Sequence, residues 1–155
     1  MDLIPYLPLL ESEKEGTVEK VERFYIGPQI DMPKIRSEAR AGGVPTVAVA
    51  KVGNLVFTNG VVSNHPETGE HVAGDIKVQT RQVLENLKMG LEKAGTGFEN
   101  VVMVHAFLRT MEDWPAYHDV YIEYFPEHTP PPRYTVQAEM ASPELLVEIH
   151  MTAAA

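Results

Sequence analysis

Residues 75–110 read DIKVQTRQVLENLKMGLEKAGTGFENVVMVHAFLRT, and this stretch decides the fold. In its first half, the residues of one helical face recur at steps of three and four. They are Ile76, Thr80, Val83, Leu84, Leu87, Leu91 and Ala94. Asp75 occupies an N-cap position and Gly95 a C′ position, which predicts a helix over residues 76–94. Residues 101–110 are almost continuously apolar, which predicts a strand buried on both faces or close to it.

A second helix and two further strands are predicted after this stretch. Asp113 precedes an apolar stripe that Pro126 ends, as expected for a capped helix. The stripe comprises Tyr117, Val120, Tyr121, Tyr124 and Phe125. The proline-rich loop PEHTPPPR (126–133) leads to a strand over residues 134–138. Residues 145–152 alternate between two sets of side chains, which indicates a strand with one apolar face.

Two short apolar runs lie before the first helix, at residues 46–50 and 54–59, and Gly53 between them favours a tight hairpin turn. From residue 44 the order is therefore strand, strand, helix, strand, helix, strand, strand. This order predicts an α+β fold, a mixed sheet with both helices on one face. The other face would carry apolar side chains that one chain cannot cover, so we expect self-association.

The composition excludes several classes of protein. Lysine and arginine number 13 and aspartate and glutamate 22, which gives a net charge of −9 and argues against free nucleic-acid binding. The chain has no cysteine, which excludes disulfides, cysteine nucleophiles and thiolate metal sites. No apolar run approaches the roughly 18 residues of a membrane helix, and the first residues do not resemble a signal peptide. We therefore expect a cytoplasmic protein.

The 155 residues divide into an N-terminal extension, residues 1–43, and a regular domain, residues 44–155. Four prolines interrupt the extension, and residues 14–24 fit a short helix. Two interpretations of the extension remain open: it wraps around the domain or a neighbouring subunit, or it is a flexible tail.

Motifs for several chemistries are missing from the sequence. There is no G-x-S-x-G motif and no phosphate-binding loop. The six histidines include no pair spaced for one helix face, so no metal site is expected.

Arg133 and Glu148 are the residues that suggest chemistry. Arg133 follows a stiff triple proline in an acidic stretch, and a guanidinium can grip a substrate carboxylate through two hydrogen bonds. Glu148 lies in the middle of a predicted strand, where a carboxylate needs a partner or its pKa rises, and a raised glutamate suits general acid–base catalysis. His150 lies on the same face of that strand. Spacing alone leaves open that Arg133 and Glu148 form a structural ion pair between adjacent strands.

About three quarters of the chain resembles the Rid (YjgF) family of reactive-intermediate, or enamine/imine, deaminases. The arginine in a Pro-x-Arg context and the late V-E-I strand are telling positions in that family, and the helix motif QTRQVLENLK is characteristic. The matching stretches are KVGNLVFTNG (51–60), HPETGEHVAGDIKVQTRQVLENLKMGLEKAG (65–95), FENVVMVHAFLRTMEDW (98–114), VYIEYFPEH (120–128), PPRYTV (131–136) and LLVEIHMTA (145–153).

The resemblance implies a homotrimer with a fold like that of Bacillus chorismate mutase, whose sheets form a central barrel with active sites in the clefts between subunits. It implies a 2-iminobutanoate/2-iminopropanoate-type deaminase that releases ammonia and a keto acid. Arg133 would bind the substrate carboxylate, and Glu148 would position or activate the hydrolytic water. No metal or organic cofactor, nucleic acid or membrane partner is implied.

The chain departs from the family pattern at positions that line the pocket. Thr46 replaces a frequent tyrosine, His118 a second-helix asparagine, and Thr135 a frequent cysteine. Asn59 and Gly60 fall where the backbone would hold the far side of the carboxylate. These departures favour a larger, catabolic imino acid as substrate.

Two other functions are kept as alternatives. One is a non-catalytic trimer that binds a small carboxylate as a sensor or partner protein, which the pocket departures favour. The other is a ribonuclease or translation inhibitor, an activity attributed to some members of the family. The net charge of −9 and the absence of a basic stripe argue against it.

Overall fold

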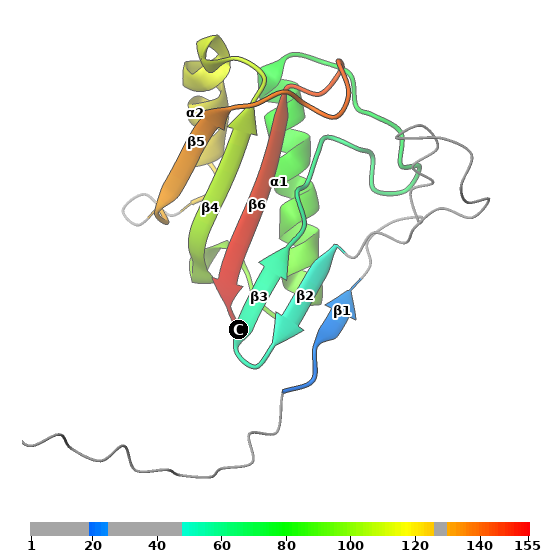
Figure 1. The fold of residues 1–155 in the computed structure, drawn as a ribbon, viewed down its shortest axis with the longest axis vertical. Coiled ribbons are helices and arrows are strands. Elements are labelled where there is room, and N and C mark those ends of the chain that lie inside the picture. Colours follow the sequence, from blue (N-terminus) through cyan, green and yellow to red (C-terminus); the bar gives the residue numbers. More distant parts are fainter. Residues whose placement is uncertain (1–18, 25–47, 126–129) are drawn as a thin grey trace, which may run out of the picture.

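The computed structural model describes residues 19–24, 48–125 and 130–155 (Figure 1). They form one six-stranded sheet in the order β1-β2-β3-β6-β4-β5, accompanied by two α-helices. The helices are α1 (Ile76–Lys93) and α2 (Trp114–Ile122). The strands are β1 (Glu22–Phe24), β2 (Val49–Val52), β3 (Leu55–Thr58), β4 (Val101–Leu108), β5 (Arg133–Gln137) and β6 (Val147–Ala154).

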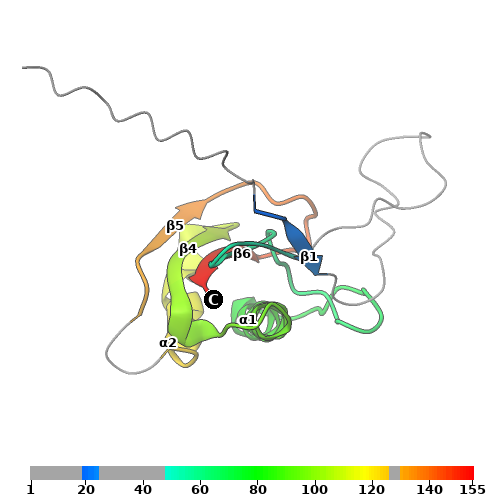
Figure 2. The same ribbon diagram turned by 90° about the horizontal axis from the view of Figure 1, so that it is seen from below.

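The sheet is mixed, as the sequence predicts. Strands β4 and β5 are parallel, and every other neighbouring pair is antiparallel. Both helices lie on one face of the sheet (Figure 2), and the core fills the space between them and the strands. The predicted α+β architecture is confirmed. No helix in the described ranges is long and apolar enough to span a membrane.

Helix α1 forms where the periodicity places it. The Asp75 side chain accepts a hydrogen bond from the Val78 amide at 3.0 Å, which satisfies one free N–H of the first turn. At the other end Gly95 adopts a φ of +83°, a left-handed conformation that favours glycine just past a helix. All the residues of the predicted face are buried. The sequence therefore predicts this helix to within one residue.

The hairpin and the last strand are also confirmed, although β6 begins and ends two residues later than the predicted range 145–152. Gly53 has a φ of +54° in the turn between β2 and β3, which pair antiparallel. In β6 the apolar residues Val147, Ile149 and Met151 are buried against the helices. The residues between them lie on the opposite face and are only half-buried.

Strand β4 is not buried on both faces, so that prediction is wrong. Val104, Ala106 and Leu108 are buried, whereas Val102 is 47% exposed and Phe107 is half-buried. The reason is that both helices cover the same face, so alternate residues of a central strand remain uncovered.

The second helix differs from its prediction at both ends. It begins after a short 3₁₀ turn, and Asp113 occupies the N-cap position without a side-chain hydrogen bond. The Thr110 hydroxyl instead accepts from the Glu112 amide at 3.3 Å, capping the 3₁₀ turn. The helix ends at Ile122, before Pro126 is reached.

The predicted helix over residues 14–24 is wrong where the structure describes it. Residues 22–24 form β1, which pairs antiparallel with β2. Without β1, strand β2 would be the edge of the sheet and would have unpaired backbone N–H and C=O groups. These groups form hydrogen bonds with residues 22–24 when that segment is a strand, and could not do so if it were a short helix. Phe24 also packs against the core. The remainder of the extension, including the 43/44 boundary, lies outside the described residues.

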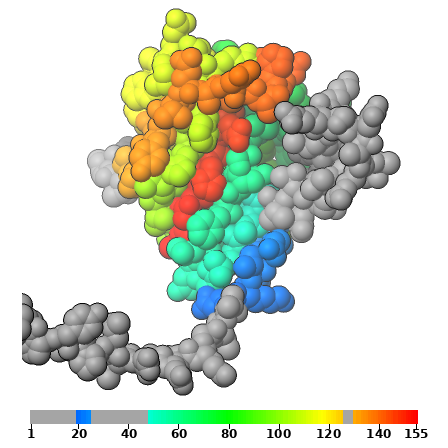
Figure 3. Space-filling model, viewed as in Figure 1, coloured from blue at the N-terminus to red at the C-terminus, as the bar shows by residue number. Residues whose placement is uncertain are grey.

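The face opposite the helices carries apolar side chains that nothing in the described part of the chain covers. Leu55, Phe57, Tyr134 and Val136 are 37–60% exposed there. Figure 3 shows this open face, with β6 at the surface between β3 and β4. An apolar face of this kind is typical of an interaction surface, so self-association remains our prediction.

Candidate functional site

The two residues expected to carry chemistry lie on opposite faces of the sheet. Arg133 pairs with Val104 of β4, and Glu148 pairs with Phe107. Residues three apart in a strand point to opposite faces, so Arg133 lies on the helix-covered face and Glu148 on the open face. Strand β4 separates β5 from β6, and no ion pair joins the two residues in the structure as described. The interpretation of a structural ion pair within one chain is therefore wrong.

Arg133 is held by helix α2. Its Nη2 donates to Nδ1 of His118 at 3.1 Å. The guanidinium carbon lies 4.2 Å from the ring centroid of Tyr121 and 5.3 Å from that of Tyr117, both within cation–π range. The preceding loop is anchored to the sheet, because the Val104 amide donates to the Pro132 carbonyl at 3.0 Å. The guanidinium is thus fixed by both its backbone and its neighbours.

One side of this guanidinium lacks a partner. The Nη1 atom is buried and makes no hydrogen bond to any described residue. The hydroxyls of Thr135, Tyr117 and Tyr121 are also buried and make no well-formed hydrogen bond with a described residue. The Tyr117 hydroxyl nevertheless lies close enough to Arg133 and Thr135 for both groups to oppose the rise of its pKa. Thr135 pairs with the buried Ala106, which places it on the same face as Arg133. A buried cationic donor without an acceptor is suited to an incoming anion.

The surroundings of Arg133 are uncharged. Burial raises the pKa of Tyr117, and the nearby positive charge of Arg133 only partly opposes that rise. Burial likewise raises the pKa of Tyr121. Both phenols are therefore neutral at pH 7. Since no carboxylate pairs with Arg133 among the residues described, its charge is not neutralised by this part of the chain.

Glu148 belongs to a separate cluster on the open face. A bridge between Val61 and Ile149, with hydrogen bonds of 2.9 and 3.0 Å, aligns the end of the β3 segment with β6. Gly60 consequently lies directly against the Glu148 side chain, and a Cβ atom built at Gly60 would overlap Oε1 of Glu148. The Glu148 carboxylate makes no hydrogen bond or ion pair with another described residue. Oδ1 of the adjacent Asn59 is buried without a partner.

The structure thus divides the predicted site residues into two groups. One group lies on the helix-covered face at β5 and comprises Arg133, His118 and Thr135. The other lies on the open face and comprises Gly60 and Glu148, with Asn59 adjacent in sequence to Gly60. Thr46 lies outside the described residues. His150, which the sequence pattern places on the same strand face as Glu148, makes a hydrogen bond of 2.7 Å between its Nδ1 and the Thr58 carbonyl.

Three aromatic residues of α2 contribute to the Arg133 group beyond the sequence prediction. Tyr117 and Tyr121 are predicted only as part of an apolar stripe, yet they face the guanidinium. Trp114 stacks on His118 with ring centroids 4.9 Å apart. The sequence spacing of these three aromatic residues places them near His118 on α2. It does not show that Arg133 lies against this side of the helix, which depends on the pairing of β5 with β4.

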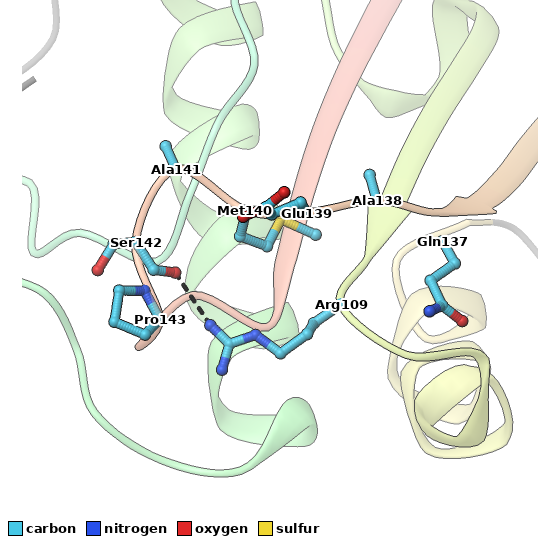
Figure 4. Close-up of a pocket in the computed structure, with 8 residues that line it drawn as sticks. All are labelled: Arg109, Gln137, Ala138, Glu139, Met140, Ala141, Ser142 and Pro143. Carbon is cyan, nitrogen blue, oxygen red and sulfur yellow. Dashed lines mark hydrogen bonds between the residues drawn. The ribbon is translucent and has the colours of Figure 1, made fainter.

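A pocket lies at the far end of β5, where it is lined by Arg109 and residues 137–143 (Figure 4). Arg109 uses Nη2 to donate to the Ser142 carbonyl at 2.9 Å, so its visible role is to hold this loop. None of the predicted site residues lines the pocket. Within the described ranges, no group of three or more His, Asp or Glu side chains is arranged to hold a metal ion.

Comparisons with known proteins agree with the fold. The model of the family described as endoribonuclease L-PSP matches residues 39–155. A RutC family protein of Pyrococcus abyssi is 40% identical over 109 residues, covering 70% of this chain and 85% of the relative. The protein named 3-aminoacrylate deaminase RutC of Acinetobacter baylyi is 40% identical over 105 residues, with 68% and 82% covered. A solved Rid-family structure from Yersinia pestis, described as of unknown function, has a TM-score of 0.68 at 31% identity, with 72% and 88% covered.

Proposed function

Since this chain belongs to the endoribonuclease L-PSP (YjgF/Rid) family, we propose that it is a hydrolytic deaminase of small enamine or imine acids. The observation that carries this proposal is the buried, unpartnered Nη1 of Arg133 beside the uncharged residues of α2. This donor set matches a substrate carboxylate, which would accept the hydrogen bond and neutralise the guanidinium.

The proposed active site requires more than one copy of the chain. Within one copy, Arg133 and Glu148 point away from each other across the sheet. Association through the apolar open face offers a way to bring Glu148 of one copy near the Arg133 edge of the next. We therefore propose a homotrimer with its sites in the clefts between subunits, and no metal or organic cofactor enters the mechanism.

The proposed reaction is hydrolysis of a C=N bond. Arg133 binds the carboxylate and so fixes the imine carbon near a water molecule. The water oxygen bonds to that carbon while Glu148 takes one of its protons as a general base. Glu148 passes this proton to the nitrogen, which gives a carbinolamine. It then takes the hydroxyl proton and delivers it to the same nitrogen, so the C–N bond breaks as the C=O bond forms, ammonia leaves and Glu148 is again ionised. An enamine substrate must first gain a proton on carbon and lose one from nitrogen to become the imine.

Two substrates separate the main possibilities. In 2-aminoacrylate the nitrogen-bearing carbon is attached directly to the carboxylate, whereas in 3-aminoacrylate it is one carbon further away. The Acinetobacter relative is named for the second compound. Their products would be a 2-keto acid and an aldehyde acid, respectively. The departures from the family pattern at His118 and Thr135 lie on the same face of the sheet as Arg133, and they are the basis for proposing a larger imino acid as the substrate.

The test is ammonia release from each substrate, generated in situ and followed by a coupled dehydrogenase. We expect Arg133→Ala to lower kcat/KM by about 30-fold or more, because it removes a charged hydrogen-bonding partner from a buried site. Arg133→Lys, which keeps the charge but loses the planar fork, should be intermediate. Equal rates for the wild type and Arg133→Ala would refute the assignment.

The two alternatives give different results in the same experiment. A non-catalytic carboxylate-binding trimer would bind 2-oxobutanoate in calorimetry, lose that binding in Arg133→Ala, and release no ammonia from any substrate. A ribonuclease would cleave RNA, but the described surface does not favour this. Two of its cations, Lys77 and Arg81, are paired with Asp119 and Glu123. The net charge of −9 further opposes RNA binding.

A further inference from the structure

The hydrogen bond between Arg133 and His118 fixes the chemical state of the histidine. An arginine guanidinium has only donors, so the Nδ1 atom 3.1 Å from Nη2 must be the acceptor. A histidine nitrogen accepts only when it carries no proton. His118 in this arrangement is therefore neutral and carries its proton on Nε2.

The ring of His118 is itself held in place. Trp114, one helical turn earlier on α2, stacks on it with an interplanar angle of 15°. Tyr121, nearly one turn later, lies under the guanidinium. Trp114, His118 and Tyr121 thus follow one another at steps of four and three along the helix, which places them on one face. This arrangement fixes the position of the acceptor, Nδ1 of His118, and the plane of the Arg133 guanidinium that donates to it.

We infer that His118 is a positioning residue for Arg133. Its Nδ1 occupies Nη2, so the guanidinium is held in one orientation and Nη1 remains for the substrate. The inference rests on the proposed function in one respect, namely that the anion received by Arg133 is a substrate carboxylate. It differs from a role in which His118, as a residue lining the pocket, contacts the substrate itself, because here the histidine acts through Arg133.

Two substitutions separate positioning from direct contact. His118→Asn places an amide oxygen near the position of Nδ1, so it can keep the acceptor. His118→Phe keeps an aromatic ring against Trp114 but has no acceptor. We expect His118→Asn to keep KM within about threefold of the wild type, and His118→Phe to raise KM by about tenfold or more, as expected when a hydrogen bond to a charged group is lost. His118→Phe leaves Nη2 without its acceptor, so its melting temperature should fall by more than that of His118→Asn, and KM is compared at a temperature where both variants are folded.

The results that would overturn the inference are distinct. If His118→Asn raises KM as much as His118→Phe, the histidine acts by direct contact or by shape rather than as an acceptor. An unchanged KM in His118→Phe would show that Arg133 needs no such support.

A second measurement does not depend on turnover. Long-range ¹H–¹⁵N correlation spectra of the histidine rings of the full chain should show His118 with a protonated Nε2 and an unprotonated Nδ1. In Arg133→Ala, Nδ1 loses its donor, so the Nε2-protonated fraction should fall toward that of an unrestrained histidine. A wild-type His118 protonated on Nδ1 would overturn the inference. Absence of ammonia release from every substrate would refute only the proposed deaminase function, since the spectra would still report the tautomer.

Discussion

Because Gly60 lies against Glu148, a substitution at Gly60 should displace the carboxylate of the proposed general base while Glu148 itself is left unmutated. Gly60 has no positive φ, so its backbone does not require glycine. What requires glycine is space: a Cβ at this position would overlap Oε1 of Glu148 and lie 2.8 Å from its Cδ. The substitution Gly60→Ala should therefore rotate the carboxylate out of its observed position.

The expected effects on stability and on activity differ greatly. Rotating one half-exposed carboxylate to a less favoured rotamer costs about 0.5–1.5 kcal/mol. Replacing glycine by alanine returns about 0.4–1 kcal/mol by restricting the unfolded chain. Net stability should thus change by less than about 1 kcal/mol. If Glu148 is the base, its displacement should lower kcat by a factor approaching the roughly 10²–10⁴ that general base catalysis supplies.

The assay is ammonia release measured beside thermal unfolding, for Gly60→Ala, Glu148→Ala and the double variant. Gly97→Ala is a matched control, because Gly97 also has no positive φ and a Cβ there would overlap the exposed Glu99 carboxylate. That variant should keep full activity. If Gly60 acts only through Glu148, the double variant will be no slower than Glu148→Ala. Wild-type kcat/KM in Gly60→Ala, or a further full loss in the double variant, would refute the reasoning.

Three further predictions concern assembly and stability. Val136→Glu places a charge on the open face, where Val136 is 46% exposed, and should convert a trimer to monomers in light scattering; unchanged mass would count against the interface. Gln79→Leu removes the acceptor of the Leu146 amide (2.9 Å) and the donor to the Glu144 carbonyl (2.8 Å). It should lower the free energy of unfolding in urea by about 2–4 kcal/mol, and an unchanged unfolding midpoint would contradict this. Burial raises the pKa of Tyr121, so its contribution to stability is complete below a pH of about 10 and is lost as the pH rises through the higher folded-state pKa. Tyr121→Phe should lose less melting temperature between pH 9 and about 12 than the wild type, and equal losses would argue against this contribution.

The elements that the sequence predicts well are those whose signals are local. Asp75 and Gly95 mark the ends of α1 within its own segment, and Gly53 marks its hairpin turn. Strand β1 is missed because only the free edge of β2 makes residues 22–24 a strand. The two-sided burial expected for β4 fails for a similar reason, since the placement of both helices on one face is not visible in the strand itself.

The site shows the same division between local and long-range information. Arg133 is conspicuous in the sequence because it follows three prolines, and the structure gives it partners on α2 that spacing does not reveal. Gly60 and Glu148 are far apart in the chain, and the bridge between Val61 and Ile149 brings them together. Neither contact could be deduced from residue spacing, because each depends on strand register.

Sheet geometry also determines which experiments can test the proposed mechanism. Because Arg133 and Glu148 project from opposite faces, a monomer that folds correctly should still bind a carboxylate weakly through Arg133 but lack the base beside it. A variant such as Val136→Glu should therefore lose kcat more than carboxylate affinity, whereas Arg133→Ala should lose both. If monomers and trimers release ammonia at equal rates per chain, the site must lie within one subunit, and Glu148 cannot be the base that serves Arg133. Comparing the rates of monomers and trimers therefore tests whether Arg133 and Glu148 act together, without a substitution at either residue.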